Sequence, residues 1–149
     1  MKVRSIVATT VAALSLMLAG ATGASATSAS GTAYFDNGQP ITANFWIQPI
    51  ADNACGNFSS SAVMNVAPNY ITNDTKFYQV GVGSVTVAGV TASVVGGDPA
   101  HLQWTNSGGA RGSYMSGRVC GTFGTFYLGA DVTASAFYYG NYRQAAAHV

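Results

Sequence analysis

Charged residues are scarce in this 149-residue chain, and glutamate is absent. Six Lys and Arg stand against five Asp, and two of those bases, Lys2 and Arg4, lie at the extreme N-terminus. No basic patch is present that would neutralise a row of phosphates, so we predict no nucleic-acid partner. A polybasic segment for anionic lipid is missing as well. A surface with so few charges has to be built from Ser, Thr, Asn, Gln and Gly.

Catalytic motifs are missing too. The chain has no Gly-x-Ser-x-Gly elbow, His-Glu-x-x-His zinc helix, phosphate loop or Gly-x-Gly-x-x-Gly fingerprint. Paired-carboxylate catalysis would need two aspartates brought together by folding. Most of them are expected in turns or loops, where an Asp side chain caps the local backbone. These turn or loop aspartates are Asp36, Asp52, Asp74 and Asp98.

His101 is the one histidine placed within the expected fold. A triad could be drawn from His101, Asp98 and a serine, but no serine occupies a distinctive turn, so a polar strand-edge histidine is the preferred interpretation. Asp52-Asn53 and Asn73-Asp74 offer hard oxygen ligands for calcium, at a lower ligand density than a dedicated loop. We therefore predict a protein that is not an enzyme, with no catalytic residue, no cofactor and no metal.

Only one long apolar run occurs, Ile6–Gly20. It follows the two N-terminal bases and precedes the small residues Ala24-Ser25-Ala26, which is the layout of a secretory signal peptide. A membrane-spanning helix needs about 20 apolar residues, and this run is shorter. We predict a signal peptide over residues 1–26 and a single exported domain over 27–149, secreted, extracellular and without a membrane anchor.

Cysteine occurs only twice, at Cys55 and Cys120. An even number in an exported chain predicts one disulfide bond, which here joins the first and second halves of the domain. Closing a loop of about 65 residues stabilises by roughly 4 kcal/mol in the chain-entropy treatment. Two cysteines and two distant histidines are too few to favour a metal site.

Helical periodicity is hard to find after residue 27, where Gly, β-branched and aromatic residues dominate and favour strands. Asn37-Gly38 predicts a hairpin turn. The next strand alternates, with Ile41, Ala43, Phe45 and Ile47 on one face. Eight or nine short strands without crossover helices predict an all-β fold, either an antiparallel β-sandwich or a small β-barrel.

Several local expectations accompany this fold. The leader Thr27–Ser30 and the tail Ala145–Val149 are expected to lack regular structure. Asn73-Asp74 is expected to form a turn. Gly89 shifts the alternation inside the expected strand Ser84–Val95 and predicts a β-bulge. The last expected strand is Asp131–Tyr142. Asn57 and Asn73 each begin a glycosylation sequon.

Aromatic residues are plentiful, with 8 Tyr, 7 Phe and 2 Trp, and all of them follow residue 26. Some fall on the polar side of their expected strands: Trp46 shares a face with Thr42 and Asn44, and Phe137 and Tyr139 alternate with small polar residues. Rings beside hydroxyl and amide groups suit sugar recognition or an aromatic-rich protein contact. The alternative is a second apolar layer covered by loops. The candidate binding residues are Trp46, Trp104, Phe137, Tyr139 and Arg111.

We therefore predict a secreted, non-enzymatic binding protein whose partner is an extracellular glycan, another polymer or a protein. Two alternatives stay open. Arg111 on a flexible loop could enter the acidic pocket of a protease, which would make the chain an inhibitor, although the loop glycines raise the cost of ordering it. Low charge and β-rich segments also fit a self-assembling cell-surface or matrix protein. The oligomeric state is not predicted.

Overall fold

The structure is a computed structural model that describes residues 27–50 and 54–149. The expected signal peptide and the loop residue Asp52 lie outside the described residues. The described part contains ten strands, whereas eight or nine were predicted. They are β1 (Thr27–Tyr34), β2 (Pro40–Ile47), β3 (Cys55–Met64), β4 (Tyr70–Gly81), β5 (Val85–Ala88), β6 (Ser93–Val95), β7 (Asp98–Ser107), β8 (Gly112–Gly121), β9 (Thr125–Tyr138) and β10 (Asn141–His148). None of the described residues forms a helix long and apolar enough to span a bilayer.

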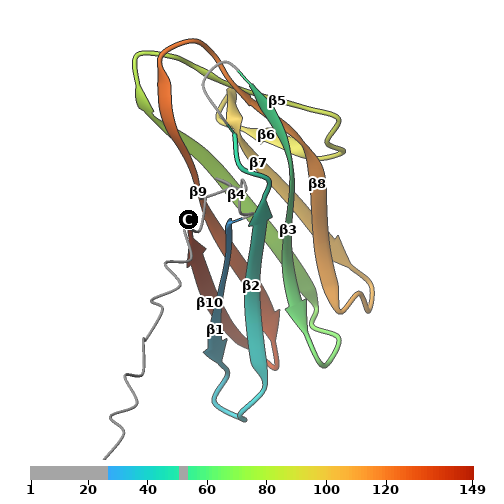
Figure 1. Ribbon diagram of the computed structural model, residues 1–149. Coiled ribbons are helices and arrows are strands. Elements are labelled where there is room, and N and C mark those ends of the chain that lie inside the picture. The colour runs from blue at the N-terminus through green and yellow to red at the C-terminus, as the bar shows by residue number, and fades with distance from the viewer. Residues whose placement is uncertain (1–26, 51–53) are drawn as a thin grey trace, which may run out of the picture.

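The strands form two antiparallel sheets of five strands that pack face to face (Figure 1). Sheet A has the order β1-β2-β3-β8-β5, and sheet B has the order β10-β9-β4-β7-β6. This arrangement confirms the all-β prediction and selects the sandwich over the barrel. At one edge of the sandwich, β1 of sheet A lies beside β10 of sheet B (Figure 1). There, a Cβ added to Gly31 would lie 1.7 Å from the carbonyl oxygen of Ala146, so the contact requires glycine.

The core lies between the sheets because alternate side chains of each strand point inward. Ile41, Ala43, Phe45 and Ile47 of β2 are all buried, as their alternation predicted. From β3, Phe58 meets Phe77 of β4 edge to face, with ring centroids 4.7 Å apart. This ring pair joins sheet A to sheet B at the centre of the domain.

A buried polar cluster crosses the same interface. Asn73 of β4 is 0% exposed, and its side-chain amide donates to Oγ of Ser60 on β3 at 2.9 Å. Thr75 lies 2.8 Å from Ser60, oxygen to oxygen, and 3.4 Å from Oδ1 of Asn73. The cluster satisfies its own hydrogen-bonding groups, which is what allows it to lie in an apolar core.

The expected turn at Asn73-Asp74 is therefore wrong, because both residues lie inside β4. Asn and Asp are common in turns, but here tertiary hydrogen bonds hold them in an extended strand. The burial of Asn73 also excludes glycosylation of its sequon in the folded domain. Asn57 of the other sequon lies on the exposed side of β3.

Both ends of the domain are more ordered than expected. Thr27–Ser30 belongs to β1 and pairs with the end of β2, and Ala145–Val149 belongs largely to β10 and pairs with β9. Ala145, Ala147 and Val149 are buried, so alternating alanines make β10 an inward-facing strand. Small side chains carry little hydrophobic signal, which is why the sequence pattern missed this strand.

Two expected strands are divided differently. Asp131–Tyr142 is not one strand, because Tyr139 and Gly140 both have positive φ (51° and 74°) and form the tight turn between β9 and β10. Ser84–Val95 is not one bulged strand either. Its first part is β5 in sheet A and its last part is β6 in sheet B, with Gly89 in the connection between them.

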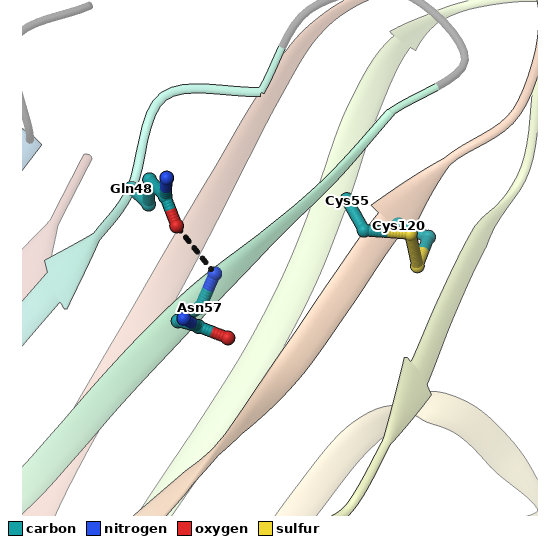
Figure 2. The surroundings of a disulfide bond; sticks show 4 residues. All are labelled: Gln48, Cys55, Asn57 and Cys120. Carbon is teal, nitrogen blue, oxygen red and sulfur yellow. Dashed lines mark hydrogen bonds between the residues drawn. A yellow bond between two sulfur atoms is a disulfide. The ribbon is translucent and has the colours of Figure 1, made fainter.

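The disulfide prediction is confirmed (Figure 2). Cys55 and Cys120 lie directly opposite each other on β3 and β8, with Cα atoms 4.0 Å apart. Cys55 was expected in a loop but lies at the first position of β3. Near the bond, Oε1 of Gln48 accepts from the backbone amide of Asn57 at 3.3 Å, which closes the end of the β2–β3 pair. A disulfide indicates an oxidising environment.

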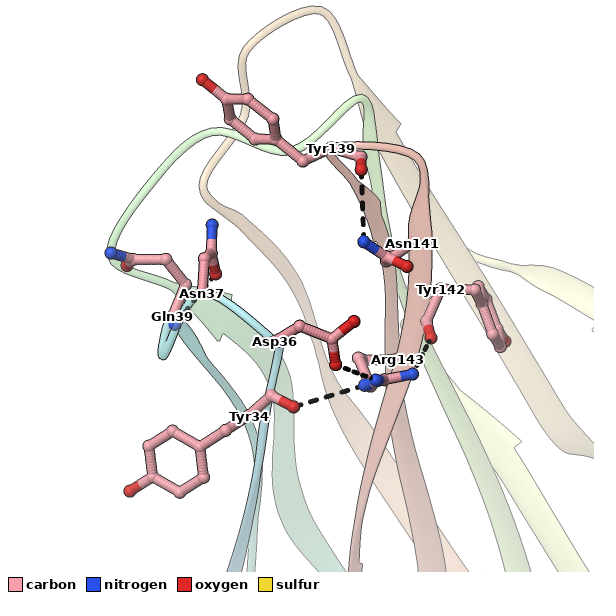
Figure 3. Close-up of polar contacts among 8 residues, drawn as sticks. All are labelled: Tyr34, Asp36, Asn37, Gln39, Tyr139, Asn141, Tyr142 and Arg143. Atoms are coloured by element: carbon pink, nitrogen blue, oxygen red, sulfur yellow. Dashed lines mark hydrogen bonds and ion pairs between the residues drawn. The ribbon is translucent and has the colours of Figure 1, made fainter.

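The two hairpin turns at the opposite end of the sandwich meet around Arg143 of β10 (Figure 3). Its guanidinium donates to the carbonyl oxygen of Tyr34 at 3.3 Å and pairs with the carboxylate of Asp36. Gly38 has a φ of 80°, which confirms the predicted turn at Asn37-Gly38. This contact ties the turn after β1 in sheet A to β10 in sheet B.

Candidate functional site

The outward face of sheet A carries a groove between exposed aromatic rings. Register places Asn44 of β2, Ser61 of β3 and Tyr114 of β8 in one row across the sheet. The adjacent row holds Trp46, Ser59 and Ser116 from the same three strands. These residues line a hollow of about 270 Å³, which contains no charged side chain. Trp46 and Tyr114 therefore lie diagonally across a floor of serines.

Both rings are accessible to a ligand. Trp46 is 39% exposed and Tyr114 is 66% exposed. From the strand spacing and the rise along each strand, their Cα atoms are roughly 12 Å apart. Two apolar ring surfaces separated by hydroxyl groups form an elongated, neutral surface that offers both stacking and hydrogen bonding to a ligand.

Hydrogen bonds hold the polar part of the groove in place. The side chain of Asn44 accepts from Oγ of Ser30 at 2.9 Å and donates to Oγ of Ser61 at 3.2 Å. The amide is therefore used at both ends, and its orientation is set by its two neighbours. The serine hydroxyls of β3 and β8 complete the lining without large side chains, which keeps the groove open between the rings.

Gly112 provides the space for the Tyr114 ring. A Cβ built on Gly112 would lie 2.5 Å from the Cε2 and hydroxyl oxygen of Tyr114. The ring therefore lies directly over the backbone of Gly112, two residues earlier on β8. A glycine at this position acts on the groove by placing the ring, without contributing a side chain of its own.

The groove continues beyond Ser116 into a second hollow of about 490 Å³. Asn57 and Arg118 line it, together with Ala88 and Gly89 at the end of β5. This hollow exists because β5 pairs only with the last part of β8, from Arg118 to Gly121. Upstream of Arg118, β8 has no β5 neighbour, and Gly117 packs closely against Val90 of the connection that follows β5.

The predicted binding residues do not gather at one place. Trp46 lies in the groove on sheet A. Phe137 lies on the outward side of sheet B, where its ring stacks on that of Tyr70 with centroids 6.0 Å apart. Trp104 of β7 is partly buried against the core. Tyr139 is 79% exposed at the β9–β10 turn, where its ring points away from the Arg143 contacts (Figure 3).

Arg111, the fifth predicted residue, is exposed on the loop between β7 and β8. Its carbonyl oxygen accepts a hydrogen bond from the amide of Met64 at 2.8 Å. Tyr114 was not among the binding residues predicted from the sequence. The alternation of Met115 and Val119 on the inward side of β8 was a signal that would have placed Tyr114 outward.

A separate hydrogen-bonded cluster lies on sheet B. Nε2 of His101 lies 2.8 Å from Oδ1 of Asp74, whose other oxygen accepts from Gln103 at 2.9 Å. Asp98, the partner considered from sequence, instead caps the backbone amide of Ala100 at 2.9 Å. Within the described ranges, no serine or cysteine is hydrogen-bonded to His101, so the pair lacks the nucleophile of a triad.

Metal ligands do not converge either. Across residues 27–50 and 54–149, no group of three or more His, Cys, Asp or Glu side chains is placed to hold an ion. Asp131 and His148 form a second pair, 2.6 Å apart, and the His148 ring stacks on Tyr78. The groove on sheet A brings exposed aromatic rings and hydrogen-bonding side chains together on one described surface. No protein-family model and no curated protein matches the sequence.

Proposed function

We propose that this protein is a secreted, non-enzymatic binding domain that recognises an extracellular glycan on the outward face of sheet A. The observation that carries the proposal is the pair of exposed rings, Trp46 and Tyr114, across an uncharged serine-lined groove of about 270 Å³. Sugar rings present apolar faces to aromatic side chains and hydroxyls to the serines and Asn44. The disulfide and the signal-like N-terminus support an extracellular setting.

Binding assays with insoluble polysaccharides test the proposal directly. The purified protein should be depleted from solution by at least one glycan matrix. Trp46→Ala and Tyr114→Ala should each weaken binding roughly thirtyfold, the size expected when an aromatic anchor at the centre of an interface is truncated. Gly112→Ala should weaken binding as well, because the added Cβ displaces the Tyr114 ring.

Tyr142→Ala is the matched control, because Tyr142 is an exposed aromatic on β10 of the other sheet. It should bind like the unmodified protein. Circular dichroism and thermal melts should show that all four variants stay folded. Equal binding by the unmodified protein and by Trp46→Ala and Tyr114→Ala would remove the groove from consideration.

The protease-inhibitor alternative receives less support. Arg111 is exposed, but its carbonyl oxygen is already bonded to Met64, whereas a reactive-site carbonyl has to be free to enter the oxyanion hole of a protease. Inhibition of a trypsin-like enzyme that is lost in Arg111→Ala would reinstate this function. Self-assembly would be recognised by a sedimentation coefficient that rises with concentration.

A further inference from the structure

The groove does not end at the aromatic rings, because Ser116 lines both hollows on sheet A. Along β8, the outward side chains in order are Tyr114, Ser116 and Arg118. Along the strand direction, Arg118 therefore lies about 7 Å beyond the row of Trp46 and Ser116, and about 13 Å beyond Tyr114. The two hollows form one track from Trp46 to Arg118.

Arg118 is exposed, and it has no carboxylate partner among the described residues. No acidic side chain lines either hollow. The four described aspartates are engaged elsewhere: Asp36 with Arg143, Asp74 with His101, Asp131 with His148, and Asp98 with the amide of Ala100. The track therefore has a neutral aromatic end and a positively charged end.

A guanidinium at the end of a groove is a receptor for an anion, because its parallel N–H groups match the two oxygens of a carboxylate. Asn57, opposite Arg118 on β3, also lines this hollow and carries an amide that can donate to the same anion. If sugar rings stack on Trp46 and Tyr114, as in the proposed function, the anionic group belongs to the same chain of sugar rings. A uronic acid residue supplies a ring face and a carboxylate together.

We infer that the glycan recognised by this groove is acidic, with a uronate carboxylate bound at Arg118. This inference rests on the proposed function. Sugar rings stack at Trp46 and Tyr114, and the charged residue of the chain lies in the second hollow. The end of β5 at Ala88 leaves this hollow open to a polymer that continues past the edge of the sheet.

Polygalacturonate and its fully methyl-esterified form test the charge alone, because the two polymers share one backbone. In affinity electrophoresis the protein should bind the acid form about tenfold more tightly than the ester, a difference typical of one charge-assisted hydrogen-bonded contact. Arg118→Gln should abolish this preference, so that the acid form and the ester bind the variant equally. Arg111→Gln removes an exposed arginine outside the track and should keep the preference.

The outcomes separate the inference from the proposed function. Equal affinity for both polymers, or an unchanged preference in Arg118→Gln, overturns the inference while loss of binding in Trp46→Ala upholds the groove. Tighter, Arg118-dependent binding to dextran sulfate than to polygalacturonate overturns the choice of a carboxylate. Failure to bind any of these polymers or any neutral polysaccharide overturns the proposed function itself.

Discussion

Replacing Ser60 with alanine should destabilise the domain far more than the loss of one hydroxyl group implies. Ser60 accepts from the fully buried amide of Asn73 at 2.9 Å and lies 2.8 Å from the hydroxyl of Thr75. In Ser60→Ala the Asn73 amide loses its acceptor in a place that water does not reach. Leaving a buried donor unsatisfied costs about 1–3 kcal/mol, so we expect a loss of about 2 kcal/mol.

The triple variant Ser60→Ala, Asn73→Leu, Thr75→Val tests the reason for that loss. It removes every member of the cluster and leaves no orphaned polar group, so it should cost less than Ser60→Ala alone. Ser59→Ala is the control, because the neighbouring serine points outward from the same strand. A surface change of this kind should stay within about 0.5 kcal/mol.

Equilibrium urea denaturation followed by tryptophan fluorescence gives the free energies of unfolding. For a domain of this size, 2 kcal/mol corresponds to a drop of about 8 °C in Tm. Equal stability of Ser60→Ala and Ser59→Ala would show that the buried amide of Asn73 does not depend on the Ser60 hydroxyl. A triple variant that loses more stability than Ser60→Ala alone would contradict the role given to the orphaned amide.

Three further predictions concern the rest of the domain. Replacing Cys55 and Cys120 together with serine should cost about 4 kcal/mol, seen as a lower urea midpoint that reducing agent no longer changes. Gly31→Ala should lower Tm at least twice as much as Gly140→Ala. The methyl group at position 31 would clash with the backbone of β10, whereas the one at position 140 would only strain a residue with positive φ. Equal losses in Tm would argue against the close β1–β10 contact. Burial, with Tyr127 and Asp131 nearby, raises the pKa of Tyr78 above 10.0, so the unfolded chain loses this proton first. The contribution of Tyr78 to the free energy of unfolding is therefore complete below pH 10 and decreases as the pH rises through the pKa of the folded state. Tyr78→Phe should flatten this part of a plot of stability against pH. An identical plot for the variant would refute the assignment to Tyr78.

Much of the fold could be predicted from alternation. The inward set of β2 and the outward position of Trp46 follow from the two-residue period of a strand, which depends only on neighbouring residues. The turn at Asn37-Gly38 could be predicted because it depends on two adjacent residues. The disulfide could be predicted because the chain has only two cysteines to pair. Prediction failed where side chains carry little signal, as in the alanine-rich β10, or where a turn-forming pair such as Asn73-Asp74 lies inside a strand.

The same reasoning from alternation predicted only part of the binding surface. Trp46 was identified because it interrupts a polar face, but its partner Tyr114 is 68 positions away in the chain. Their proximity depends on β3 lying between β2 and β8, and strand order is a property of the packed sheets. The second hollow likewise depends on where β5 stops pairing with β8.

Residue type and local alternation alone were therefore sufficient to predict the all-β fold class, the inward faces of several strands and the single disulfide. Each of these follows from interactions between near neighbours or from having only two cysteines to join. Tertiary packing decided which strands are adjacent, which polar residues are buried and which exposed rings share a groove. Those outcomes depend on contacts between distant segments, whose free energy is gained only when the two sheets come together.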